Sequence, residues 1–183
     1  NGEVYNYREL RRDLEKEGVE FRSTSDTEVV AYALHRWGPE RAVPLFDGMF
    51  ALAYFDDLAS TLWLARDRLG IKPLYIATPN GGVVFASEMK AILAHPDISC
   101  RPDMHALTTH LIHDYLEGSW TPFEGIRSLR PGTICRVNSG STKEITYFDI
   151  ERDLDVDRLL ESNRRDPETV LAEFNNAFSA SVQ

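Results

Sequence analysis

Apolar residues at helical spacing dominate the first part of the chain. Tyr7, Leu10 and Leu14 recur every three to four positions and predict an amphipathic helix, which Gly18 ends. A second helix is expected over residues 26–37, where apolar positions again repeat with this period and stop at a Gly-Pro pair. The chain therefore begins with a helical layer.

Polar residues mark the start of this second helix. Ser25 followed by Glu28 predicts a capping box, in which each side chain binds the backbone N–H of the other residue. A short strand is expected at Glu20 to Arg22, and a further short helix over residues 39–45.

From residue 49 the pattern changes to strands. Met49 to Phe55 is apolar at consecutive positions, which predicts a strand covered on both faces. Further strands are expected at residues 61–65, 74–77, 83–86, 132–137 and 144–148. The turns between them, at 56–60, 79–82 and 138–141, are short, so neighbouring strands must be antiparallel. With helices before and after the strands, the pattern predicts an α+β fold whose sheet is buried on both faces.

The pattern changes again towards the end of the chain. A helix is expected near Glu88 and another over residues 103–115. Residues 149–166 are rich in Asp, Glu and Arg and are expected to form a linker. A last helix is expected over residues 167–183, after an Asp cap and a first-turn proline. We expect its apolar stripe to meet a second domain; the alternative is that it packs back on residues 1–148.

Composition narrows the class of protein. The chain of 183 residues is 43% hydrophobic and 27% charged, as in ordinary globular domains. Its formal net charge of −9 argues against nucleic acid or an anionic membrane as the main partner. We find no apolar run of membrane-spanning length and no signal-peptide pattern. Because the sequence does not begin with Met, we expect the natural N-terminus to lie upstream.

Cysteines and histidines do not predict a metal site. Cys100 and Cys135 lack metal-ligand spacing and are expected to be small, partly buried thiols in a reducing compartment. His105, His110 and His113 share one expected helix, but no two of them are four residues apart. We expect these histidines to be solvated or hydrogen-bonded.

The first residues offer candidate chemistry. Asn1 has a side-chain amide donor, and Gly2 allows its backbone N–H to approach a ligand closely. Two such donors aimed at one oxygen form an oxyanion hole. The residues alone favour a simple turn into a helix. Similarly, Asp26 fits the first turn of a helix on electrostatic grounds alone.

Six stretches in this order carry a family resemblance: residues 1–10, 25–29, 47–51, 65–75, 85–91 and 129–132. Together they resemble the glutaminase domain of glutamine-hydrolysing asparagine synthetases, which are class II glutamine amidotransferases. The resemblance covers Asn1 to about Phe148. Lys72 and the Ser-Glu-Met-Lys run at 87–90 resemble the asparagine synthetase branch more than other branches.

The resemblance implies a fold and a reaction. The implied fold is a four-layer αββα sandwich of antiparallel sheets covered by helices, as in N-terminal-nucleophile hydrolases, here truncated at its N-terminus. In this family an N-terminal cysteine attacks the side-chain amide of glutamine, and its own α-amino group is the base. The ammonia released passes to a second domain, which uses ATP to amidate aspartate.

Site residues follow from the matching motif positions. Asn1 and Gly2 match the oxyanion hole, and Glu3 and Asp26 match the carboxylates that hold the α-amino end of glutamine. Three other signature residues are expected to shape the sheet edge and the interdomain face: Arg66, Asp67 and Lys72.

The resemblance also implies partners. L-Glutamine is the expected substrate, and a C-terminal synthetase domain beyond Gln183 is expected to bind ATP and Mg²⁺, while residues 1–183 bind no cofactor. The nucleophilic cysteine and an arginine for the substrate carboxylate are expected upstream, so this chain alone is expected to be inactive. We expect a cytoplasmic protein with no nucleic-acid or membrane partner. Formation of a homodimer is left as an open question at this point.

Two alternatives remain at this point. One is a relative that makes another amide or a β-lactam ring. The other is a degenerate glutaminase-like domain that serves as a scaffold or regulatory module. Retention of Asn1, Gly2, Glu3 and Asp26 argues against simple decay of the site.

Overall fold

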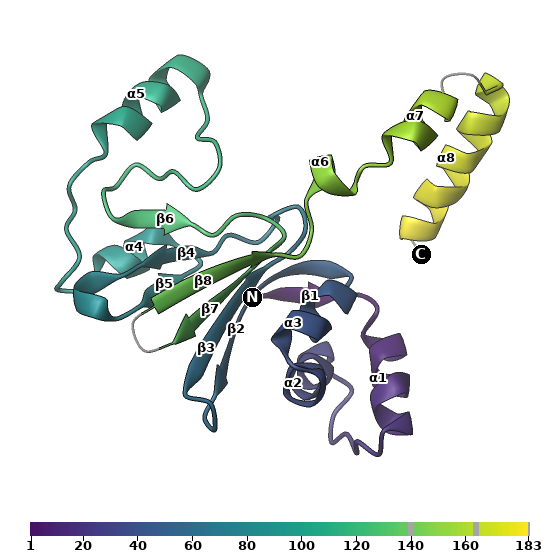
Figure 1. Ribbon diagram of the computed structural model, residues 1–183, viewed down its shortest axis with the longest axis horizontal. Coiled ribbons are helices and arrows are strands. Elements are labelled where there is room, and N and C mark those ends of the chain that lie inside the picture. Colours follow the sequence, from purple (N-terminus) through teal and green to yellow (C-terminus); the bar gives the residue numbers. More distant parts are fainter. Residues whose placement is uncertain (139–140, 163–164, 183) are drawn as a thin grey trace. The chain divides into compact units, whose positions relative to one another are not determined.

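The structure is a computed structural model that describes residues 1–138, 141–162 and 165–182. It contains two compact units, Asn1–Asp149 and the segment from Ile150 onwards (Figure 1). Each unit is described by itself. The domain boundaries at Phe148 and Asp166 remain a prediction.

Two antiparallel sheets form the centre of the first unit. The larger sheet has the strand order β1-β2-β3-β7-β8, and the smaller has the order β5-β4-β6. The strands of the larger sheet are β1 (Gly2–Val4), β2 (Gly48–Asp56), β3 (Thr61–Arg66), β7 (Thr133–Asn138) and β8 (Ser141–Thr146). Those of the smaller are β4 (Tyr75–Ala77), β5 (Val84–Ala86) and β6 (Ile126–Ser128). All paired strands are antiparallel, as predicted.

Helices flank the two sheets. Figure 1 shows α1 (Tyr7–Lys16), α2 (Asp26–Trp37) and α3 (Pro39–Ala42) on one side of the larger sheet. A 3₁₀ turn, η1 (Val43–Leu45), follows α3, and another, η2 (Pro79–Gly81), connects β4 to β5. The remaining helices of this unit are α4 (Met89–Leu93) and α5 (Met104–His113).

Three buried clusters separate four layers. The first packs α1 and α2 on the larger sheet, with Leu14, Val29 and Phe50 at its centre. The second, which includes Leu64 and Ile76, lies between the two sheets. The third packs α4 on the smaller sheet through Ile92, Ala77 and Ile126. This order of layers confirms the predicted αββα sandwich.

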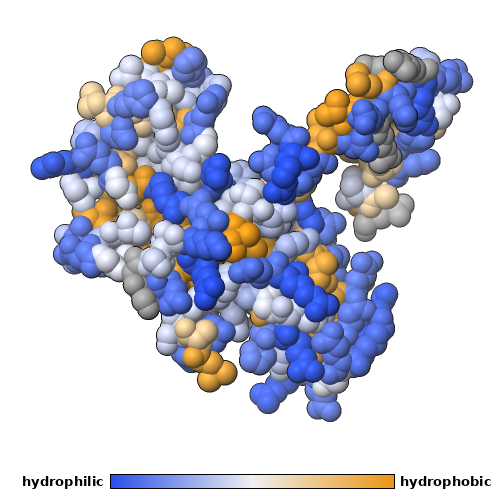
Figure 2. Space-filling model, viewed as in Figure 1, coloured by the Kyte–Doolittle hydropathy of each residue, from blue (hydrophilic) through white to orange (hydrophobic). Residues whose placement is uncertain are grey.

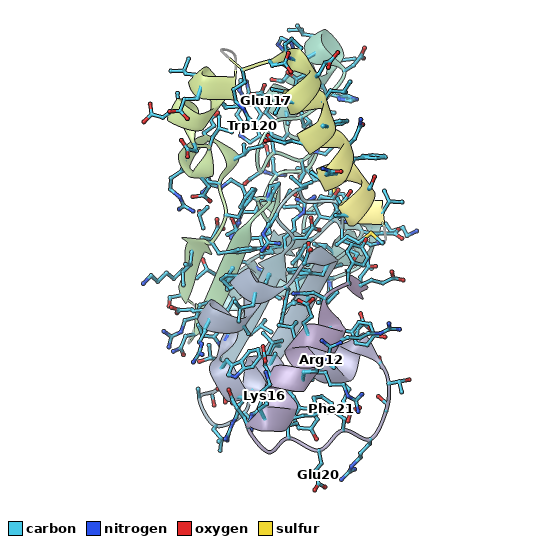
Figure 3. All side chains as sticks on the ribbon, turned by 90° about the vertical axis from the view of Figure 1, so that its right-hand side faces the viewer. Arg12, Lys16, Glu20, Phe21, Glu117 and Trp120 are labelled. Atoms are coloured by element: carbon cyan, nitrogen blue, oxygen red, sulfur yellow. The ribbon has the colours of Figure 1, made fainter. Side chains whose placement is uncertain are left out.

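The predicted strand at Glu20 to Arg22 is wrong. These residues form a loop after α1 (Figure 3), and the N–H groups of Arg22 and Ser23 donate to the Glu28 carboxylate at 2.9 and 2.7 Å. The Ser23 hydroxyl also donates to Glu28 at 2.6 Å. This hydroxyl, with the Arg22 N–H, lowers the pKa of the Glu28 carboxyl from its usual value. The loop's N–H groups therefore bind a side chain and not a neighbouring strand.

The capping box takes a different form from the predicted one. Ser25 does cap α2, but its hydroxyl accepts from the N–H of Thr27 and not from that of Glu28. Glu28 in turn binds the preceding loop and leaves the Ser25 N–H to the Ser23 hydroxyl, at 3.2 Å. A competing hydroxyl two residues upstream explains the difference.

Only half of β2 is covered on both faces. Phe50 belongs to the first core and Ala51 to the second, as the double-sided pattern predicts. Further along, Phe55 is 57% exposed, so this end of the strand is not covered on both faces. The turn predicted at 138–141 includes residues outside the described ones.

The second unit consists of helices. They are α6 (Ile150–Asp153), α7 (Val156–Ser162) and α8 (Pro167–Val182), so the segment expected as a linker carries two short helices. Asp166 accepts the N–H of Thr169 at 3.1 Å, which confirms the predicted start of α8. Exposed apolar side chains lie along α7 and α8: Leu159, Leu160, Leu171, Phe174, Phe178 and Val182. Figure 2 shows orange patches on the surface of this unit.

One buried carboxylate organises the loop between β3 and β4. Asp67 is 1% exposed and accepts four backbone N–H groups. Oδ1 binds Leu69 at 3.1 Å and Ile71 at 2.9 Å, and Oδ2 binds Phe50 at 3.2 Å and Lys72 at 3.0 Å. The carboxylate thereby ties this loop to β2.

Asp67→Asn should destabilise the chain strongly. An amide has one acceptor oxygen, so two of the four N–H groups around this buried side chain would lose their partner, and the free energy of unfolding should fall by about 3 kcal/mol or more. Urea unfolding of the purified chain measures the change. The control Asp57→Asn, in the exposed β2–β3 turn, should change stability by less than about 0.5 kcal/mol. Equal effects of the two substitutions would contradict the role of Asp67.

Candidate active site

The candidate site lies along β1, an edge strand of the larger sheet. β1 pairs with β2 alone, in the register Gly2 opposite Phe50 and Val4 opposite Gly48. Its other edge therefore has no strand partner in the described part of the chain. Backbone groups along that edge are free to bind side chains or a ligand.

Strand pairing determines which N–H groups face the open edge. Asn1 and Ala51 exchange two hydrogen bonds, from Ala51 N–H to Asn1 C=O at 2.8 Å and from the Asn1 amino group to Ala51 C=O at 3.1 Å. In an antiparallel ladder such pairs alternate with pairs that share no hydrogen bond. Gly2, opposite Phe50, is therefore in a non-bonded pair, and its N–H points away from β2.

The same alternation explains the next two residues. The Tyr5 N–H points back and donates to the Asp47 carbonyl at 2.7 Å. The Val4 N–H points outward and donates to Oδ2 of Asp26 at 3.1 Å. Gly2 and Val4 thus direct their N–H groups to the same edge, and Asp26 lies on that edge.

Asp26 is held at the start of α2. Its Oδ1 accepts the Thr27 N–H at 2.8 Å, while its Oδ2 binds Val4. Ser25 caps the same helix, so the carboxylate occupies the favourable positive end of the helix dipole. The structural role expected for Asp26 is therefore present. Oδ1 also accepts from the hydroxyls of Ser25 at 3.5 Å and Thr27 at 3.4 Å, whereas Oδ2 keeps a lone pair for another donor.

All four sequence-predicted site residues line one small cavity, of about 90 Å³. They are Asn1, Gly2, Glu3 and Asp26. Sequence reasoning missed other lining residues, which include Thr27, Val30 and Leu52. Val30 could have been found, because it lies one helical turn after Asp26 on the same face.

Gly2 is required by the backbone. Its φ of +134° suits glycine, and a Cβ there would lie 2.1 Å from the carbonyl oxygen of Met49. Gly48 on β2 is equally restricted, since a Cβ there would lie 2.1 Å from the carbonyl oxygen of Glu3. The two strands approach so closely at these positions that neither accepts a side chain.

The side chain of Asn1 reaches a different part of the fold. Its Nδ2 donates to Oγ of Ser87 at 3.3 Å. Ser87 lies between β5 and α4 and was not predicted as a site residue.

Three signature residues contact the strand and loop next to the site: Arg66, Asp67 and Lys72. Asp67 binds the N–H of Phe50, opposite Gly2. The half-buried Arg66 guanidinium donates to the Lys72 carbonyl at 2.9 Å and to three other oxygens, and burial lowers the pKa of Arg66. None of the three lines the cavity at Asn1.

Neither cysteine lines this cavity. Cys135 is buried between the two sheets, and burial raises the pKa of its thiol. Cys100 is exposed. Among the described residues no group of three or more His, Cys, Asp or Glu side chains is placed to hold a metal ion. His105 instead packs against Trp120, with the ring centroids 4.5 Å apart.

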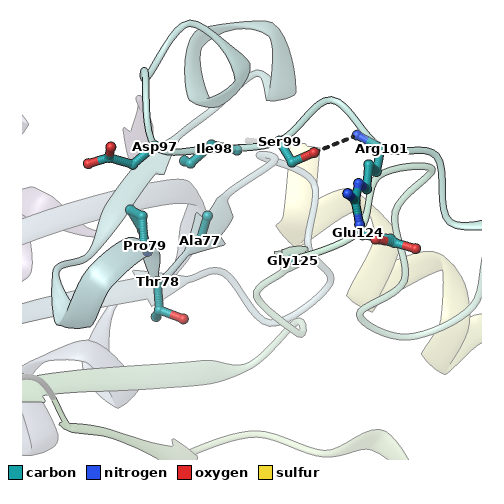
Figure 4. A pocket seen from close by; sticks show the side chains of 9 residues that line it. All are labelled: Ala77, Thr78, Pro79, Asp97, Ile98, Ser99, Arg101, Glu124 and Gly125. Atoms are coloured by element: carbon teal, nitrogen blue, oxygen red, sulfur yellow. Dashed lines mark hydrogen bonds between the residues drawn. The ribbon is translucent and has the colours of Figure 1, made fainter.

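Larger cavities lie elsewhere in the first unit. One of about 730 Å³ includes Trp120 and Arg127, and another, of about 470 Å³, lies between Asp97 and Arg101 (Figure 4). Neither contains a predicted site residue. Convergence of residues, and not size, therefore identifies the candidate site.

Solved structures with a similar fold identify the structural class. A glutamine phosphoribosylpyrophosphate amidotransferase of Bacillus subtilis aligns with a TM-score of 0.55 and 21% identity, over 80% of this chain and 28% of that chain. The allosteric regulatory enzyme of purine biosynthesis aligns equally well, with a TM-score of 0.55. The fold is that of N-terminal-nucleophile glutamine amidotransferases.

The family follows from sequence. A model of the glutamine amidotransferase domain matches residues 1–148, and the chain belongs to this family. Asparagine synthetase [glutamine-hydrolyzing] 3 of Bacillus subtilis is 37% identical over 161 residues, which are 86% of this chain and 26% of that protein. Asparagine synthetase [glutamine-hydrolyzing] 3 of Arabidopsis thaliana is 45% identical over 93 residues, 50% of this chain and 16% of that protein.

The chain spans about a quarter or less of the length of these curated relatives. It is homologous to the glutaminase half of glutamine-hydrolysing asparagine synthetases. No helix in the described residues is long and apolar enough to cross a membrane.

Gly2→Ala should destabilise the chain and displace β1. A methyl group would meet the Met49 carbonyl at 2.1 Å, so stability should fall by about 2 kcal/mol or more. Chemical unfolding measures the loss. Gly18→Ala is a matched control, because Gly18 also has a positive φ, of +86°, but has open space around it. Its cost should be about 1 kcal/mol; an equal cost at both positions would show that the close approach of β1 is unimportant.

Proposed function

We propose that this domain releases ammonia from glutamine, and that the longer protein uses the ammonia for ATP-dependent amidation of aspartate. The observation that carries this proposal is the convergence of Asn1, Gly2, Glu3 and Asp26 on one cavity at the open edge of β1. The asparagine synthetase names of the relatives support the choice of aspartate as acceptor.

The dimensions of the edge fit glutamine. Gly2 and Val4 are two residues apart on a strand, so their outward N–H groups are roughly 6.6 Å apart. An extended glutamine spans about 6 Å from its side-chain carbonyl oxygen to its α-amino nitrogen, from standard bond lengths. A glutamine along β1 can therefore place its amide at Gly2 while its ammonium group reaches Asp26, which binds Val4.

Asn1 and Gly2 are the proposed oxyanion donors. When a nucleophile attacks the glutamine amide, the carbonyl oxygen becomes negatively charged. The outward Gly2 N–H and one N–H of the Asn1 carboxamide would stabilise that charge without having to reorganise.

Glu3 and Asp26 are the proposed ligands of the α-amino group. Both side chains line the cavity, and two carboxylates favour an ammonium group over a neutral one. Asp26 then has two functions, since it also binds the N–H groups of Val4 and Thr27.

The attacking thiolate is proposed to come from a segment that precedes Asn1 in the longer protein. Cys100 and Cys135 do not line the cavity, so neither is placed to attack a glutamine there. The α-amino group of that cysteine would take the thiol proton and pass it to the departing nitrogen, so that a γ-glutamyl thioester forms as ammonia leaves. Water would then hydrolyse the thioester to glutamate and restore the thiol.

ATP and Mg²⁺ are proposed to act in a separate synthetase part of the longer protein. A cytoplasmic location is also proposed, because both cysteines are free, as is usual in a reducing compartment. The alternatives, a scaffold domain or a maker of another amide or a β-lactam, are not favoured, since the similar proteins carry asparagine synthetase names.

Asp26→Asn tests the proposed grip on the substrate. In the full-length protein it should raise the KM for glutamine about ten- to a hundredfold, because the ammonium group loses a charged partner. Ammonia-dependent synthesis should stay nearly unchanged. Steady-state kinetics with each nitrogen source measure both effects.

Glu28→Gln is the matched control for Asp26→Asn. Glu28 lies in the same first turn of α2 and also accepts backbone N–H groups, but it does not line the cavity. Its substitution should leave the KM for glutamine unchanged. If Asp26→Asn reduced glutamine- and ammonia-dependent synthesis equally, the assignment of Asp26 would be refuted.

Asn1→Ala tests the oxyanion hole. Loss of one preorganised donor should lower kcat for glutamine hydrolysis by about 10²–10³ with little change in KM. An unchanged kcat would exclude Asn1 from the oxyanion hole. A raised KM at constant kcat would instead assign Asn1 to substrate binding alone.

A further inference from the structure

We propose that Ser87 is a positioning residue, whose hydroxyl orients the Asn1 carboxamide for the oxyanion. This inference rests on the proposed function. It assigns a role to the serine of the Ser-Glu-Met-Lys run, which the proposed substrate contacts do not explain.

The main chain of Asn1 is already fixed. Two hydrogen bonds with Ala51 hold it in the ladder with β2. Its side chain is less constrained, because the terminal torsion of Asn has a broad, roughly two-fold preference. In the described structure the carboxamide makes one hydrogen bond, from Nδ2 to Oγ of Ser87 at 3.3 Å.

This bond leaves a suitable donor free. The Asn1 amide nitrogen has two hydrogens, and Ser87 accepts one of them. The second remains for the glutamine oxygen. Without the hydroxyl the carboxamide would rotate, and in part of the population its own Oδ1 would face the negatively charged oxygen.

Ser87 is itself held in place by the second sheet. The residue before it, Ala86, pairs with Tyr75 of β4, and Met89, two residues after it, packs in the third core. Asn1 belongs to the first sheet by its bonds to β2. The Asn1–Ser87 bond thus orients a catalytic donor from a second, independently packed layer.

Substrate binding should not depend on this contact. Glu3 and Asp26 are the proposed ligands of the opposite end of glutamine, and neither binds Ser87 in the described structure. Loss of the hydroxyl should therefore lower kcat and leave KM unchanged. Because the bond is long and exposed, the expected loss is about three- to tenfold, far below that of Asn1→Ala.

Ser87→Thr and Ser87→Val in the full-length protein form the central comparison. The two side chains have nearly the same size, and only Thr keeps the hydroxyl. Glutamine hydrolysis should be close to normal in Ser87→Thr and three- to tenfold slower in Ser87→Val and Ser87→Ala. Ser99→Ala is the control, since Ser99 lies in a loop and binds the N–H of Arg101 (Figure 4).

The double variant Asn1→Ala/Ser87→Ala separates positioning from a general structural role. If Ser87 acts through Asn1, the double variant should be no slower than Asn1→Ala alone. A further three- to tenfold loss in the double variant would overturn the proposal, as would equal rates for Ser87→Thr and Ser87→Val. A normal kcat in Asn1→Ala would refute the proposed oxyanion hole first, so the two failures are distinguishable.

Discussion

The buried Asp67 carboxylate is the interaction on which the candidate site depends. Four N–H groups use its four lone-pair positions, and one of them belongs to Phe50 in β2. Phe50 pairs with Gly2, so the carboxylate fixes the strand from which β1 takes its register. The burial of this carboxylate is tolerated because four N–H dipoles converge on it.

The same residues make the structural contacts of the site and its proposed substrate contacts. Asp26 joins β1 to α2, and its position is what places a carboxylate at the end of a glutamine-sized edge. Similarly, the ladder that fixes Asn1 also turns the Gly2 N–H outward. Precision at the proposed oxyanion hole therefore comes from β-sheet pairing, which is stiffer than a loop.

Periodicity in the sequence was sufficient for the longer helices and strands of the first unit. The helices around Leu10 and Val29 and the doubly covered start of β2 follow directly from their apolar spacing. Prediction failed where a nearby side chain competed for backbone N–H groups, as Glu28 does at the expected strand over residues 20–22. The spacing of apolar residues along the chain does not predict which side chain will bind these N–H groups.

The site itself was less predictable from pattern. β1 has three residues, too few to show a period, and Asn1, Gly2, Glu3 and Asp26 were assigned by family resemblance. Ser87 lies 86 positions from Asn1, and only the packing of the two sheets brings them together. Contacts of this kind depend on the tertiary fold.

The close approach at Gly2 and Gly48 has a consequence for protein engineering. Each glycine faces a carbonyl of the opposite strand at a distance that excludes any side chain, so a change at one position cannot be rescued at the other. Redesign of the cavity must therefore proceed from α2, where the side chains of Thr27 and Val30 line it. One wall of the cavity is fixed by the backbone, and the other is formed by side chains that can be exchanged in an experiment.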